Sequence, residues 1–202
     1  MNNIREEIEA YNISLLKAGA IAPRALKVGV SDEQLNRLNS LEMVELTTEL
    51  KEYLSVVNGY DDGLSLELRF FEAGYAWGMW SMSVDDIIDT YNSTRLYVTD
   101  EDDESFWPAG FLPILNSNNS DFLLVNCRRG SPTHGKVYDF TECGGIELTA
   151  HSLVDFFSCC KRMLDESVVK FKTPTCWEIC DLEEFLDATS RLLKSSSRVA
   201  SW

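Results

Sequence analysis

Helix patterns occupy the first 60 residues of the chain. In residues 2–18, apolar side chains recur every three or four positions, which predicts an amphipathic helix. Residues 31–34 read Ser-Asp-Glu-Gln, a capping box that predicts the start of a second helix. A third helix is predicted over about 46–57, and Gly59 lies where that helix should end.

Strand patterns follow after residue 60. Apolar and polar residues alternate from Leu64 to Phe70, which predicts a strand with one face in solvent. Residues 75–80 are a second strand candidate, and a short helix is predicted to begin at Ser83. The chain therefore changes from helical to strand periodicity before its middle.

A central hairpin is predicted over residues 107–126. Its two apolar runs flank residues 116–120, which are polar and typical of a turn. Pro108 and Pro113 cannot donate backbone hydrogen bonds, so the first strand is expected to be short or irregular. Trp107 is expected to be buried at the edge of the sheet, because a ring beside a proline in an acidic loop needs a packing partner.

The last third of the chain mixes strands and helices. Residues 136–140 and 146–148 predict two more strands, and a helix is predicted over about 151–166. A terminal amphipathic helix is predicted after Pro174. The whole pattern predicts an α+β fold with a mainly antiparallel central sheet of about five or six strands, flanked by helices.

Negative charge is concentrated in one part of the chain. The 202 residues carry a net charge of −15, and residues 61–126 contribute −11 with thirteen acids and two bases. An acidic surface repels nucleic acid and anionic membranes and attracts basic proteins. We therefore expect a basic protein partner, no nucleic acid and no membrane. The alternative is that the acids serve solubility alone.

The sequence also predicts where the protein is located and whether it binds metal. The first seven residues are acidic and have no apolar segment of a signal peptide, which predicts a cytoplasmic protein. The six cysteines include no CxxC pair and are expected to be free thiols. A zinc site would have to combine Cys176 and Cys180 with His134 or His151, and that spacing is weak. We expect no metal and no cofactor.

Candidate catalytic groups are few. A Cys–His nucleophile would need a thiol beside one of only two histidines. The adjacent acids at 85–86 and 102–103 have the groups for acid–base or metal chemistry, but such pairs are more often helix caps and solvated charge. Residues 144–145 are glycines that lack the spacing of a phosphate-binding loop. The residues themselves therefore offer little catalysis.

Four stretches of the chain follow one another in a recognisable order: Glu49–Gly59, Phe106–Ile114, Asp121–Asn126 leading to Gly135–Tyr138, and His151–Phe157. In this order they resemble the SUKH superfamily, which groups fungal Smi/Knr cell-wall regulators with bacterial toxin-immunity proteins. The resemblance covers about residues 30–166. Thr47 and Thr48 stand where the family often has proline, and Leu153 stands where its closing helix usually has phenylalanine.

The resemblance implies a SUKH (Smi/Knr-like) domain over residues 25–172, with an N-terminal helical extension over 1–24 and a C-terminal amphipathic helix and tail over 173–202. It also implies a binding module without catalysis. Bacterial members resemble immunity proteins that neutralise a cognate toxin, often a nuclease. Fungal members are signalling and scaffold proteins. Cytoplasmic toxin immunity is the preferred interpretation, and a Smi/Knr-like adaptor is the alternative.

The densest group of acids is the first candidate for the partner-binding surface. A charge run of this kind cannot pack in a core, so it lies in solvent or against a basic partner. Trp107, Pro108 and Gly59 are expected to have structural roles around it. The candidate partner-binding residues are Asp100, Glu101, Asp102, Asp103 and Glu104, with Asp85 and Asp86 as weaker candidates.

Overall fold

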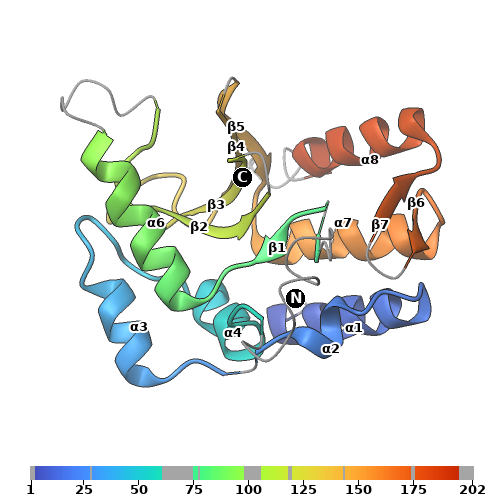
Figure 1. Cartoon of the computed structure of the whole chain (residues 1–202). Helices are drawn as coiled ribbons and strands as arrows, with labels where there is room; N and C mark the ends of the chain where they lie inside the picture. The colour runs from blue at the N-terminus through green and yellow to red at the C-terminus, as the bar shows by residue number, and fades with distance from the viewer. Residues whose placement is uncertain are drawn as a thin grey trace.

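The computed structural model describes residues 3–27, 29–60, 75–76, 78–97, 106–117, 120–142, 144–173 and 176–195 (Figure 1). Two predicted features lie outside these ranges: the alternating strand at 64–70 and the acidic run at 100–104. The described residues combine helices with a five-stranded antiparallel sheet and a separate two-stranded sheet. This arrangement confirms the predicted α+β class.

The N-terminal helices begin where side chains cap them. Asn3 accepts a hydrogen bond from the backbone of the first helix, and Thr47 does the same for the fourth. Ser31 and Gln34 form the predicted capping box. Each cap satisfies a backbone N–H that has no partner inside its helix. The helices are α1 (Ile4–Lys17), α2 (Ala22–Ala25), α3 (Asp32–Asn39) and α4 (Thr48–Val56).

The five strands of the main sheet are neighbours in the same order as in the chain, and every pair is antiparallel. The central hairpin is present, with Phe111 opposite Asn126. Its register shifts between Pro113 and Leu115, so the first strand is irregular as predicted. The strands are β1 (Trp80–Ser81), β2 (Phe111–Asn116), β3 (Phe122–Asn126), β4 (Val137–Thr141) and β5 (Gly145–Ala150).

One face of the main sheet packs against helices to form the core. The helices α6 (Val84–Tyr97) and α7 (Leu153–Asp165) join α1 and α4 in this core. Phe157 of α7 lies at its centre, with ring centroids of Tyr11 and Tyr53 both 5.6 Å away. Ser152 caps α7 by accepting from Asp155 N. Helix α1 lies along α7, so the first helix is part of the core (Figure 1).

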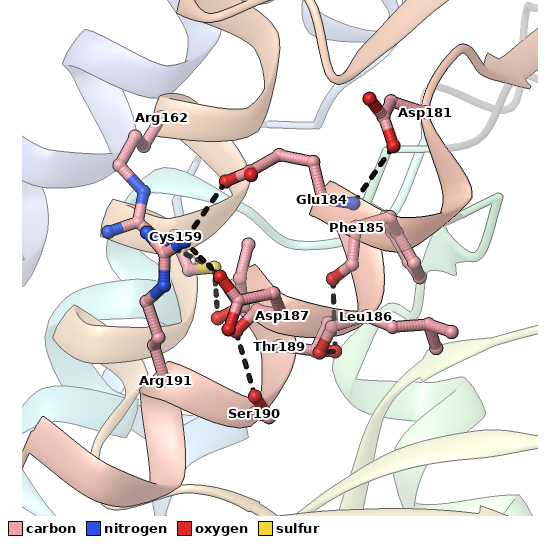
Figure 2. A network of polar contacts seen from close by, with 11 residues as sticks. Cys159, Arg162, Asp181, Glu184, Phe185, Leu186, Asp187, Thr189, Ser190 and Arg191 are labelled. Atoms are coloured by element: carbon pink, nitrogen blue, oxygen red, sulfur yellow. Dashed lines mark hydrogen bonds and ion pairs between the residues drawn. The ribbon is translucent and has the colours of Figure 1, made fainter.

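The C-terminal part of the chain adds a hairpin and the predicted amphipathic helix. The hairpin of β6 (Val169–Thr173) and β7 (Cys176–Ile179) was not predicted. Helix α8 (Leu182–Ser195) then packs against α7 and β5. Figure 2 shows Cys159 of α7 beside α8. The Cys159 thiol donates to the backbone oxygen of Ala188 at 3.8 Å.

The structure corrects two sequence predictions next to the sheet. Residues 75–80 were a strand candidate, but Ala76 forms an isolated bridge with Met79, and among the described residues of this segment Trp80 alone pairs with β2, together with the following Ser81. The helix after Ser83 was predicted to be short, but α6 has 14 residues. The division of the chain at residues 24 and 172 stays a prediction.

Candidate partner-binding surface

The weaker candidate Asp85 belongs to an ion pair between two helices. It lies in the first turn of α6, and its Oδ1 is 2.7 Å from Nη1 of Arg37 on α3. Both side chains are at least half exposed, so the pair contributes little to stability. Its carboxylate is therefore held in place by α3 and still faces solvent.

Asp86 caps its own helix. Its Oδ2 accepts hydrogen bonds from Ser83 N at 3.0 Å and from Ser83 Oγ at 2.6 Å. Ser83 Oγ in turn accepts from Asp86 N at 3.1 Å, which completes a reciprocal cap. Asp89 lies one turn further along α6 and is exposed. The outward side of α6 therefore begins with three carboxylates, two of which also have structural partners.

The stronger candidates at 100–104 lie outside the described residues, but the structure describes the segments on both sides of them. Helix α6 ends at Tyr97, and the chain is described again from Phe106. Arg95 Nη1 donates to the backbone oxygen of Trp107 at 3.3 Å and so joins the two segments. The assignment of the acidic run to the binding surface stays a prediction.

Trp107 is buried, as expected, but it does not lie at the edge of the sheet. Its ring centroid is 5.4 Å from that of Phe122 on β3 and 5.0 Å from that of Phe140 on β4. The indole Nε1 donates to the backbone oxygen of Phe111 at 3.2 Å. The ring therefore covers the face of the middle strands. The sequence could not show this, because it depends on how the segment before β2 folds back over the sheet.

Pro108 and Gly110 shape the corner that holds Trp107. The Pro108 carbonyl accepts from Phe111 N at 3.2 Å and closes a turn. Gly110 has a φ of +82°, and a Cβ at this position would lie 2.5 Å from Cα of Arg128. Its amide donates to the hydroxyl of Tyr91 on α6 at 2.9 Å. The corner is thus tied to α6 and to the segment that follows β3.

Gly59 lies where α4 meets the start of α6. A Cβ at this glycine would lie 2.8 Å from the backbone nitrogen of Ser83. Its neighbour Asn58 is buried and joins two further segments: Nδ2 donates to Gly29 O, and Oδ1 accepts from Val84 N, both at 2.9 Å. Sequence reasoning missed Asn58, and its place before a helix-ending glycine is the only local signal.

An apolar cluster that the sequence analysis did not single out covers the other face of the main sheet. No helix among the described residues contributes to it, whereas the core contains residues of α1, α4, α6 and α7. The alternating apolar positions of β3, β4 and β5 are the signal that could have revealed it. We call it the outer aromatic face, and it consists of Phe106, Trp107, Phe111, Phe122, Leu124, Tyr138, Phe140 and Ile146.

Charges are separated along the same sheet. At one end of the sheet, β3 begins, β4 ends and β5 begins. At this end Phe122 is opposite Phe140, and Phe140 is opposite Ile146. This end of the sheet is acidic. The opposite end, where β3 ends and β4 begins, is basic. The acidic end carries Asp121, Asp139, Glu142 and Glu147, and the basic end carries Arg128, Arg129 and Lys136.

The pKa of the Asp139 carboxyl group is raised by its burial and by the acidic end of the sheet. Burial first, and then the carboxylates of Asp121 and Glu147, raise the pKa of Asp139 to about 6. Its Oδ1 is buried and has no hydrogen-bond partner among the described residues. Asp139 lies directly opposite Glu147 in the β4–β5 pairing, and like charges at that position oppose each other.

The pKa of Asp139 predicts how pH changes stability. An unfolded aspartate has a pKa of about 3.9, so the folded state binds this proton more tightly. The contribution of the group to stability is therefore full below pH 4 and is lost as pH rises through 6. Asp139→Asn should stabilise the protein at pH 7.5 by about 1 kcal/mol, because partial contact with water reduces the cost of the charge.

Urea unfolding at pH 7.5 and pH 4 would measure this effect, and the stabilisation should disappear at pH 4. Glu142→Gln removes one charge from the same end at an exposed position. It should change stability by less than about 0.5 kcal/mol at both pH values. Equal stabilisation by Asp139→Asn at pH 4 and pH 7.5 would contradict the assignment.

Cys127 and Cys160 are buried, and His134 contacts a backbone oxygen. Burial raises the pKa of the Cys127 thiol to about 12 and that of Cys160 well above its ordinary value. His134 Nε2 lies 2.8 Å from the backbone oxygen of Glu45. Within the described ranges, no group of three or more His, Cys, Asp or Glu side chains is placed to hold a metal ion. In the same part of the chain, no helix is long and apolar enough to span a membrane.

Comparison with known families identifies the class of protein. A model described as the SMI1 / KNR4 family (SUKH-1) matches residues 29–159, which is more than half of the chain. The chain therefore belongs to this family, and the resemblance to the SUKH superfamily is confirmed. A comparison with curated proteins gave no match. Helices α1 and α8 lie outside the matched range although both pack against α7.

Proposed function

We propose that this protein is a non-catalytic, cytoplasmic immunity protein that neutralises a cognate toxin by binding it directly. Membership of the SUKH-1 family is the observation that carries the proposal. The concentration of negative charge in residues 61–126 adds that the toxin is basic at the contact. A nuclease has this property, because its substrate cleft binds phosphates.

The acidic run at 100–104 is the proposed first contact with the toxin. An inhibitor must capture a nuclease before nucleic acid is cut, so it benefits from fast association. Complementary charges on the two partners raise the association rate by steering their encounter. Exposed carboxylates at 85, 86 and 89 add negative charge on α6. Asp85 and Asp86 take a smaller part, since each also has an internal partner.

Growth rescue tests the proposal. The toxin domain encoded beside the gene is expressed in a sensitive host, with and without this protein. Rescue together with a purified one-to-one complex would support immunity. Where the neighbouring gene encodes no toxin, candidate toxins are expressed in turn, and no rescue from any of them would contradict immunity and favour the Smi/Knr-like adaptor.

Charge reversal tests the proposed contact. Changing Asp102, Asp103 and Glu104 to Lys should leave folding nearly intact, because exposed charges contribute little to stability. It should slow association with the toxin about tenfold or more at low salt and flatten the salt dependence. Stopped-flow mixing at several salt concentrations would measure both effects.

A second triple variant controls for net charge. Glu6, Glu9 and Glu33 are exposed acids on α1 and α3, and their replacement by Lys changes the net charge by the same amount. This control should slow association much less, because the charges lie outside the proposed contact. Equal rates for the wild type and the variant at 102–104 in low salt would show that the site assignment is wrong.

A further inference from the structure

The outer aromatic face presents rings to solvent. Phe106 is 40% exposed, and its ring meets that of Phe140 edge to face at a centroid distance of 5.2 Å. Phe122, Tyr138 and Ile146 are partly exposed around the buried Trp107. Contiguous apolar surface with partly exposed aromatic rings is typical of a protein contact. No helix in the described part of the chain covers this face.

The charge around these rings determines what kind of partner fits. Phe122, Phe140 and Ile146 lie at the acidic end of the sheet, next to Asp121 and Glu142. The bases of the sheet lie at its opposite end. A second copy of the chain is unsuited to this face, because both copies would bring acidic ends and a net charge of −15.

We propose that the outer aromatic face binds arginine side chains of a cationic protein partner. A guanidinium group is planar, so it stacks on an aromatic ring while its N–H groups reach a carboxylate. Lysine has the same charge but is more strongly hydrated and cannot pair in this planar way. The exposed ring of Phe106 and the carboxylate of Glu142 are the two groups that we assign to this contact. The identity of the partner as a toxin rests on the proposed function.

Two peptides of equal charge test the arginine preference. Octa-arginine and octa-lysine are titrated into the full-length protein while amide signals are followed by two-dimensional NMR. Octa-arginine should bind about fivefold or more tightly than octa-lysine, and its largest shifts should lie at Phe106, Tyr138 and Ile146. Equal affinities, or shifts centred away from the sheet, would overturn the proposal.

Two variants separate the ring from the charge. Phe106→Leu keeps an apolar side chain but removes the aromatic ring, so it should lower the affinity for octa-arginine to that for octa-lysine. Glu142→Gln keeps the ring, so it should weaken both peptides by similar factors. Leu96→Ala changes the 80% exposed apolar residue on α6 and should change neither affinity. Retention of the arginine preference in Phe106→Leu would contradict the assigned contact.

Further measurements distinguish a toxin partner from a second copy of the chain as the molecule that binds the outer aromatic face. A dimer in analytical ultracentrifugation that Phe106→Leu dissociates would assign the face to a second copy and overturn the proposal. If the wild type rescues growth and Phe106→Leu binds the toxin with unchanged affinity, this inference fails and immunity stands. If the wild type rescues no growth, the proposed function fails, and the peptide titration still decides the arginine preference.

Discussion

Replacement of Trp107 by alanine should lower the free energy of unfolding by about 3–5 kcal/mol. The ring is 1% exposed and packs against the rings of Phe122 and Phe140. Alanine would leave a cavity over the middle strands and remove the hydrogen bond from Nε1 to the Phe111 carbonyl. The two surrounding rings are fixed on separate strands, β3 and β4, so they cannot collapse fully into the space.

Urea unfolding followed by circular dichroism would measure the loss. Leu96→Ala is a suitable control, because it removes a large apolar side chain that is 80% exposed. It should change the free energy of unfolding by less than about 0.5 kcal/mol. A loss below about 1 kcal/mol for Trp107→Ala would show that the ring does not support the outer aromatic face.

Local sequence signals predicted most of the fold because the relevant interactions are local. The capping box at Ser31 involves residues three apart, and the polar turn at 116–120 joins adjacent strands. The hairpin of β6 and β7 also had a local signal. Val169 and Phe171 alternate with Lys170 and Lys172, as in a strand with one face in solvent.

Other features depend on distant contacts and could not be predicted from local patterns. Helix α6 continues through Ser93 and Thr94, which are weak helix formers. Arg95 holds the end of this helix by donating to the carbonyl of Trp107, 12 positions further along the chain. The pairing of Asp85 with Arg37 likewise joins residues 48 positions apart.

Sequence reasoning could identify only part of the candidate surface, because the rest depends on contacts between residues that are distant in the chain. Charge density identifies acids, but it does not show which carboxylates have internal partners, as Asp85 and Asp86 do. The outer aromatic face is built by cross-strand neighbours such as Phe122 and Phe140. Such pairs follow from strand register, which a single sequence shows only after the strand order is known.

The corner at Gly110 should be the second position of large effect. Gly110→Ala should lower the free energy of unfolding by about 2–5 kcal/mol. Part of this cost is the φ of +82°, which is unfavourable for any residue with a Cβ. The rest arises because the new Cβ would lie 2.5 Å from Cα of Arg128. Backbone atoms cannot rotate away as a flexible side chain would, so the corner and the segment after β3 must separate.

Gly130→Ala separates the conformational part of this cost from the part caused by the close approach to Arg128. Gly130 also has a positive φ, +72°, but a Cβ there would meet no atom within 4 Å. Its replacement should therefore cost only the conformational part, about 1–2 kcal/mol. The difference between the two variants in urea unfolding measures the close approach at Gly110. Equal losses would show that Arg128 moves away freely and that the corner does not hold Trp107 against the sheet.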